Sequence, residues 1–236
     1  VEKGKVALDT GIEKGKVELK LGEKNAAYFD SALVAFNKSI TIDSMYSSAY
    51  EYAGLTLYYK KDYVKAIPYF ERKVSLDTTG VNSYRNMAFC YLKTEQYGLA
   101  AGAFEKALAI KPEDITMRAM TAKIYTFAGN YGKAIEHFEY ILNHNTPDLT
   151  DSLKCEIYPD LGSSYLNQKN CQAALPYLIK AEQCKPRDVS IITNIAVSYQ
   201  MCNKVKDSNV YYKKCLAIDP NNKICKRGDL ETTIQK

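Results

Sequence analysis

The stretch YRNMAFCYLKTEQYGLAAGAFEKALAIKP, residues 84–112, contains two amphipathic segments separated by a short polar turn. Within each segment the apolar and small residues recur at steps of three and four, which is the periodicity of an α-helix with one buried face. These residues are Tyr84, Met87, Ala88 and Tyr91 in the first segment, and Ala100, Phe104, Ala107 and Leu108 in the second. Pro112 ends the second segment, because proline cannot continue a helix. The stretch therefore predicts a helical hairpin.

The same pattern recurs along the chain with a period of 34 residues. A small residue of the first helix reappears at spacings of 34, 34, 40 and 34 residues, and a large residue of the second helix keeps these spacings. The small series is Gly54, Ala88, Ala122, Gly162 and Ala196, and the large series is Phe70, Phe104, Phe138, Leu178 and Tyr212. Such a period indicates a repeat protein, in which each hairpin buries its apolar face only by stacking on its neighbours.

These units resemble the tetratricopeptide repeat (TPR), a 34-residue helix–turn–helix motif. The resemblance is carried by segments such as DYVKAIPYFERKVSLD (62–77), QYGLAAGAFEKALAIKP (96–112) and GNYGKAIEHFEYIL (129–142). It implies an all-α fold, a right-handed solenoid of antiparallel helix pairs with about six units and a terminal helix. It also implies a protein that binds other proteins, although the family binds many unrelated partners.

The period divides the chain into five regions. They are an N-terminal segment with a degenerate first repeat (1–46), three TPR units (47–148), an insertion (149–154), two further units (155–222) and a C-terminal capping helix (223–236). In the first region we expect helices at about 10–24 and 30–42. Residues 1–11 echo residues 12–22, which indicates a local duplication that extends or caps the solenoid.

The composition is that of an ordinary soluble globular protein, with 46% hydrophobic and 25% charged residues among 236. No apolar run approaches the roughly 18–20 residues that a membrane span needs, and the first 24 residues lack the apolar core of a secretory signal. The net charge of +5 is too small and too scattered to indicate nucleic-acid binding. There is no glycine-rich phosphate loop and no metal-binding motif, so we expect neither an enzyme nor a cofactor or metal.

In a stack of this kind the first helices line the concave side. Helical spacing predicts that aromatic and basic side chains of three successive first helices face this groove. They are Tyr58 and Tyr59, then Arg85, Phe89 and Lys93, then Lys123 and Phe127. The pattern favours an extended peptide or a helix of a protein partner, with acidic character. The alternative is that the aromatic rings pack between adjacent first helices and that the cations are merely solvated.

Six of the seven cysteines follow residue 154. With helix pairs placed as in this family, three pairs are expected to meet: Cys155 with Cys184, Cys171 with Cys202, and Cys215 with Cys225. Disulfides would place the chain in an oxidising compartment, periplasmic or extracellular. The alternative is that cysteine replaces alanine in tight cores, which would fit a cytoplasmic protein. Cys90 is interpreted as a small buried apolar residue.

The sequence thus predicts a non-catalytic scaffold or adaptor that binds its partner through the concave groove. Two alternatives stay open. The protein is a structural component that assembles with itself or within a cell-envelope complex, or it is the targeting region of a larger enzyme, an option that the absence of an initiator Met leaves open.

Overall fold

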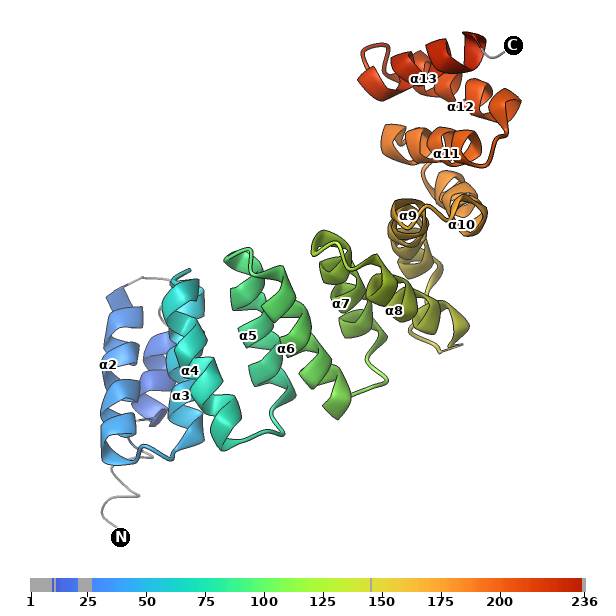
Figure 1. Ribbon diagram of the computed structural model, residues 1–236. Coiled ribbons are helices and arrows are strands. Elements are labelled where there is room, and N and C mark those ends of the chain that lie inside the picture. Colours follow the sequence, from blue (N-terminus) through green and yellow to red (C-terminus); the bar gives the residue numbers. More distant parts are fainter. Residues whose placement is uncertain (1–9, 11, 21–26, 145, 235–236) are drawn as a thin grey trace. The chain divides into compact units, whose positions relative to one another are not determined.

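The computed structural model describes residues 10, 12–20, 27–144 and 146–234, and every regular element in these ranges is an α-helix. Within residues 27–110 and within residues 115–234, adjacent helices pack against one another, so the fold is an all-α solenoid of helix pairs, as the repeat pattern predicts (Figure 1). The helices divide into two compact units, residues 1–114 (unit 1) and residues 115–236 (unit 2).

Unit 1 begins with a helical segment at residues 12–20. It continues with α2 (Ala27–Ile42), α3 (Ser47–Tyr59), α4 (Tyr63–Leu76), α5 (Val81–Lys93) and α6 (Tyr97–Ile110). Consecutive helices from α2 to α6 pack against one another, and α3 also contacts α5. Helix α2 starts three residues before the expected position. The partner expected at about 10–24 is described only at residue 10 and residues 12–20, and most of the duplicated segment 1–11 lies outside the described residues.

Unit 2 contains α7 (Ile115–Phe127), α8 (Tyr131–Asn143), α9 (Asp151–Asn167), α10 (Cys171–Cys184), α11 (Val189–Met201), α12 (Val205–Ile218) and α13 (Lys223–Ile234). Helix α9 has 17 residues whereas α7 has 13, because the last four residues of the insertion at 149–154 form its first turn. The Thr150 hydroxyl caps this turn by accepting a hydrogen bond from the amide of Leu153 (3.2 Å). Helix α13 covers the expected terminal helix up to the last described residue.

The interior of each hairpin is a large side chain seated on a small one. At the same position of the repeat, each second helix carries a large, fully buried residue, namely Phe36, Phe70, Phe104, Phe138, Leu178 and Tyr212. A Cβ atom on Gly54 would lie 2.9 Å from the Phe70 ring, and one on Gly162 would lie 2.6 Å from Cγ of Leu178. The missing side chain is therefore what lets the helices of a pair approach closely.

From α3 onward, each turn inside a hairpin uses one residue in the left-handed conformation, with φ between 58° and 75°. These residues are Lys61, Glu95, Gly129, Lys169 and Asn203. The backbone amide of the residue after it donates a hydrogen bond to a carbonyl oxygen near the end of the first helix. In one example, Gln96 N donates to the carbonyl oxygen of Tyr91 (2.8 Å). This is the Schellman motif, which satisfies the last carbonyls of a helix. The second helix then starts within two residues, so the antiparallel geometry is set locally.

Tyrosine–glutamate hydrogen bonds connect successive pairs. The Tyr91 hydroxyl on α5 donates to Glu71 Oε1 on α4 (2.6 Å), and Tyr165 on α9 donates to Glu139 on α8. Burial, and then these carboxylates, raise the pKa of both tyrosines above the ordinary value. The rings therefore stay neutral donors at physiological pH and hold neighbouring pairs in register.

We expect the same glycine-to-alanine change to have opposite effects in α6 and α9. A Cβ on Gly102 meets nothing within 4 Å, so Gly102→Ala should raise the free energy of unfolding by about 0.5–1 kcal/mol through helix propensity. Gly162→Ala forces a methyl group against Leu178 and should lower it by about 1–2 kcal/mol. Urea unfolding followed by circular dichroism measures both. A stabilising Gly162→Ala would contradict the seating of Leu178 on that glycine.

A second pair of variants tests the left-handed turn position. Glu95→Gly removes the strain of a non-glycine residue at φ 60° and should stabilise the chain by about 0.5–1 kcal/mol. Gly129→Ala introduces that strain at φ 75° and should destabilise it by about 1 kcal/mol. The midpoint of thermal unfolding should rise for Glu95→Gly and fall for Gly129→Ala. Equal shifts in one direction would show that the turn conformation does not govern these positions.

Candidate functional site

Unit 1 carries a shallow cavity of about 260 Å³ between the helical segment 12–20 and α3. We call it the N-terminal groove, and it is lined by Lys16, Leu19, Lys20, Tyr52, Leu55 and Tyr59. Lys16 Nζ lies 5.0 Å from the centroid of the Tyr52 ring, and it also pairs with Glu13 (2.8 Å). The groove thus combines two tyrosine rings with two lysines, a composition suited to a peptide that carries both apolar and acidic groups.

The two tyrosines that end α3 have different environments. Tyr59 lines the N-terminal groove and keeps 48% of its surface exposed. Tyr58 is half-buried, with its ring edge-on to Tyr59 (5.8 Å between centroids) and to Tyr63 of α4 (5.5 Å). Burial raises the pKa of the Tyr58 hydroxyl. Tyr59 is therefore the ring available to a ligand, whereas Tyr58 holds it in place.

Helix α5 presents Arg85, Phe89 and Lys93 at steps of four residues, which places them on one side of the helix. Arg85 and Lys93 are exposed, while Phe89 is half-buried with its ring 5.4 Å from that of Phe104 on α6, edge to face. The expected anchor Phe89 is thus partly used in packing its own hairpin. Because α3 and α5 are in contact, the two cations lie on the helix next to Tyr59.

Lys123 and Phe127, the remaining predicted groove residues, lie on α7 in unit 2. Lys123 Nζ is 3.4 Å from a carboxylate oxygen of Glu156 on α9. It also opposes the burial that raises the pKa of Asp160. Its charge is therefore shared with carboxylates of its own unit. Phe127 is 72% exposed.

The structure thus brings the predicted residues together in two sets, one on α3 and α5 and one on α7. Sequence reasoning missed Lys16, Lys20 and Tyr52, which line or border the groove on its N-terminal side. The lysines at a step of four in GKVELK (15–20) were the available signal, but the first repeat was too irregular to be placed in register.

The cysteines after residue 154 form three disulfides in unit 2, and the pairs are those that the repeat register predicts. Cys155–Cys184 joins α9 to α10 (Cα–Cα 5.7 Å), Cys171–Cys202 joins α10 to the end of α11 (5.8 Å), and Cys215–Cys225 joins α12 to α13 (6.3 Å). Cys90 is a buried free thiol, and burial raises its pKa to about 12, so it is not a nucleophile at neutral pH.

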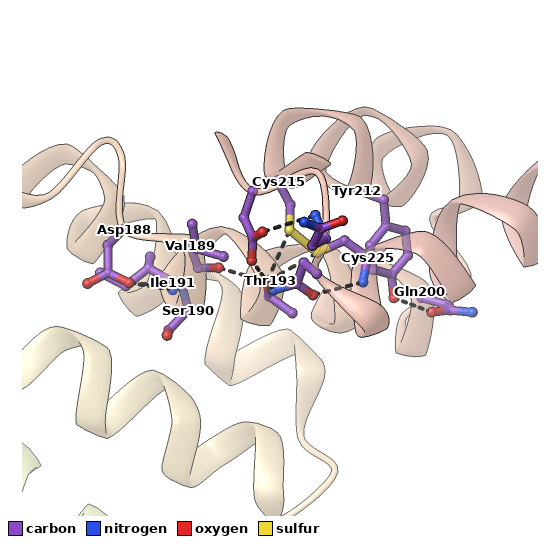
Figure 2. The surroundings of a disulfide bond; sticks show 12 residues. Asp188, Val189, Ser190, Ile191, Thr193, Gln200, Tyr212, Cys215 and Cys225 are labelled. Carbon is purple, nitrogen blue, oxygen red and sulfur yellow. Dashed lines mark hydrogen bonds between the residues drawn. A yellow bond between two sulfur atoms is a disulfide. The ribbon is translucent and has the colours of Figure 1, made fainter. Parts of the chain in front are cut away.

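The disulfide Cys215–Cys225 is enclosed by the protein. Both cysteines are fully buried, and the Thr193 hydroxyl on α11 lies 3.5 Å from Cys215 Sγ and 3.3 Å from Cys225 Sγ (Figure 2). The same hydroxyl donates to the carbonyl oxygen of Val189 (2.7 Å). Tyr212 of α12 and Gln200 of α11 are hydrogen-bonded beside it (2.5 Å).

Comparison with known proteins agrees with this geometry. A family model of the tetratricopeptide repeat matches residues 81–114. Among solved structures, YrrB, described as a TPR protein with an unusual peptide-binding site, aligns at 18% identity with a TM-score of 0.67 and covers 83% of this chain and 98% of its own. No curated protein matches the sequence.

Two further solved structures are similar. The C-terminal part of a TPR repeat-containing protein from Cytophaga hutchinsonii aligns at 17% identity with a TM-score of 0.55, over 91% of this chain and 98% of its own. A chain of the Naa15/Naa10 complex bound to HypK aligns at 17% identity with a TM-score of 0.71, over 95% of this chain. This chain spans only 34% of that one. Residues 81–114 thus match a tetratricopeptide repeat, and the chain has the fold of TPR solenoids.

TPR proteins are generally non-catalytic scaffolds, and the two histidines of this chain have structural contacts. The His137 ring stacks on Tyr125 (5.7 Å between centroids), and its Nδ1 lies 3.4 Å from Nη1 of Arg118. His144 Nδ1 is 2.7 Å from the carbonyl oxygen of Tyr140 in its own helix. Among the described residues, no group of three or more His, Cys, Asp or Glu side chains is placed to hold a metal ion. No helix of the described residues is long and apolar enough to cross a membrane.

Proposed function

We propose that this protein is a non-catalytic adaptor that binds an extended, acidic segment of a protein partner on the first-helix face of unit 1. The N-terminal groove is the observation that carries the proposal, since it combines an exposed ring at Tyr59 with the cations Lys16 and Lys20. Arg85 and Lys93 extend the basic surface onto α5. YrrB, which has a similar fold, is described as having a peptide-binding site, which supports this class of ligand.

In this proposal, the partner binds by burying its side chains against a surface that is already formed in the free protein. A partner side chain that covers the exposed part of Tyr59 gains apolar contact without ordering a loop, because α3 is already packed on both sides. Carboxylates of the partner would then face Lys20, Arg85 and Lys93, which sets orientation and excludes basic sequences.

The proposal is tested by the double variant Tyr59→Ala/Lys93→Glu. A partner is first captured from native cells and identified, and its binding segment is then titrated calorimetrically. Loss of the ring and reversal of the charge should weaken binding at least about tenfold, since anchors of this kind dominate interface energies. Lys111→Glu, an equal charge change in the exposed residue after α6, is the matched control and should have no effect. Equal affinities for all three proteins would place the site elsewhere.

Self-association is a second candidate, favoured by the outer face of the first helix pair. A cavity of about 750 Å³ lies between the segment 12–20 and α2. Two apolar side chains at this cavity, Val34 and Ile42, are 68% and 44% exposed. An exposed apolar surface of this kind is suited to another copy of the chain.

Light scattering over a range of concentrations tests this candidate. Assembly through this face predicts that the mass rises above 26.6 kDa with concentration, and that Val34→Lys returns it to the monomer value. Val64→Lys, at an equally exposed valine of α4, is the control and should leave the assembly intact. A constant mass of 26.6 kDa for the unmodified protein would exclude self-association.

A further inference from the structure

The disulfide Cys171–Cys202 lies at a cleft in unit 2. The cleft has a volume of about 540 Å³, and Cys202 forms part of its lining. Leu175 and Ile179 of α10 and the Tyr199 ring of α11 supply its other walls, and Lys204 stands at its edge. Both cysteines are partly exposed. A small molecule that enters this cleft therefore meets one cysteine of the disulfide.

The three disulfides differ in their access to solvent. Cys215 and Cys225 are fully buried next to Thr193 of α11 (Figure 2), which protects their sulfurs from any solute. Cys155 and Cys184 are partly exposed, like Cys171 and Cys202. Burial thus excludes Cys215–Cys225 as a site of reaction with a small molecule. The other two disulfides differ in where their cysteines lie along the helices.

Cys171 is the first residue of α10, directly after the capping residue Asn170, whose side chain accepts a hydrogen bond from the amide of Ala173 (3.1 Å). A thiolate at a helix N-terminus is stabilised by the helix dipole and by free backbone amides. Cys202 is the C-terminal capping residue of α11, where the dipole disfavours a negative charge. Cys171 is therefore the better leaving group, and Cys202 is the cysteine that lines the cleft.

The pair Cys155–Cys184 lacks this asymmetry. Cys155 is the fifth residue of α9, beyond the first turn, and Cys184 is the last residue of α10. The dipole effect is confined to the first and last turns, so neither sulfur of this pair is a strongly stabilised thiolate when it leaves. A cation at the cleft, Lys204, further favours the approach of an anionic thiolate to Cys202.

We propose that Cys171–Cys202 is a thiol–disulfide exchange site at which a low-molecular-weight thiol forms a mixed disulfide with Cys202. The thiol first loses its proton to solvent, and its sulfur then attacks Cys202 Sγ. The new S–S bond forms as the bond to Cys171 Sγ breaks, and Cys171 leaves as the thiolate. A second thiolate that attacks the bound thiol's sulfur releases a small-molecule disulfide and leaves Cys202 reduced. The exchange removes the covalent link between α10 and α11.

Reduced glutathione is the probe for this site. The oxidised protein is incubated with it, samples are quenched with N-ethylmaleimide at successive times, and peptides are mapped by mass spectrometry. The expected early product carries glutathione on Cys202 and maleimide on Cys171, and it should form about threefold to tenfold faster than any product of the other two disulfides. Glutathione mainly on Cys171, or equally fast opening of Cys155–Cys184, would overturn the proposal.

The route through the cleft is tested separately by filling it. Ile179→Trp should slow the modification of Cys202 at least severalfold and leave the rate at Cys155–Cys184 unchanged. Gln183→Trp, four residues further along α10 at an exposed position, is the matched control and should react like the unmodified protein. If Ile179→Trp fails to fold by circular dichroism, Pro176→Trp fills the same cleft from an exposed position. An unchanged rate in the folded cleft variant would contradict this route of attack.

Discussion

The structure depends on a contact between a large side chain of one helix and a glycine of the helix packed against it. Where Phe70 lies on Gly54 or Leu178 on Gly162, the ring or isobutyl group occupies the place of a Cβ. Close-packed interiors tolerate neither a gap nor an overlap of a single methyl group. The distance between the helices of a pair is therefore fixed by this contact, and the left-handed residue in the turn fixes their antiparallel direction. Stacking of pairs then follows, because each pair retains an apolar face that its own residues do not cover.

These packing contacts leave one face of each first helix without a role in the core. Side chains at positions such as Tyr59, Arg85 and Lys93 contribute little to the core and are free to serve recognition. Phe89 shows the limit of that freedom, since its ring also packs on Phe104. Lys123 shows another, because a carboxylate one pair further along neutralises it. An exposed position on a first helix is thus a candidate for binding only after its neighbours in the next pair have been considered.

These particulars also explain what the sequence could and could not predict. The helices, the repeat and the three disulfides follow from a period that places residues such as Cys171 and Cys202 at neighbouring turns. The pairing of Lys123 with Glu156 was hidden, because the insertion at 149–154 breaks the constant spacing between them. The turn positions carry lysine, glutamate or asparagine as well as glycine, so their left-handed conformation leaves no consistent residue signal. The N-terminal groove was missed because four glycines in residues 1–24 weaken the helical pattern there.

One of the disulfides of unit 2 lies on a helix that buries polar side chains. Helix α12 carries Ser208 and Asn209 at buried positions where α6 carries Ala100 and Ala101. Both polar side chains are hydrogen-bonded, to the Ala196 carbonyl oxygen (2.9 Å) and to Asp229 (3.0 Å) respectively, but they add less hydrophobic stabilisation than alanine in this setting. Each disulfide adds about 2–4 kcal/mol, chiefly by restricting the unfolded chain. Cys215–Cys225 joins α12, which carries these polar residues, to α13. Covalent links thus add to the packing of unit 2, whereas unit 1, whose only cysteine is the free thiol Cys90, relies on packing alone.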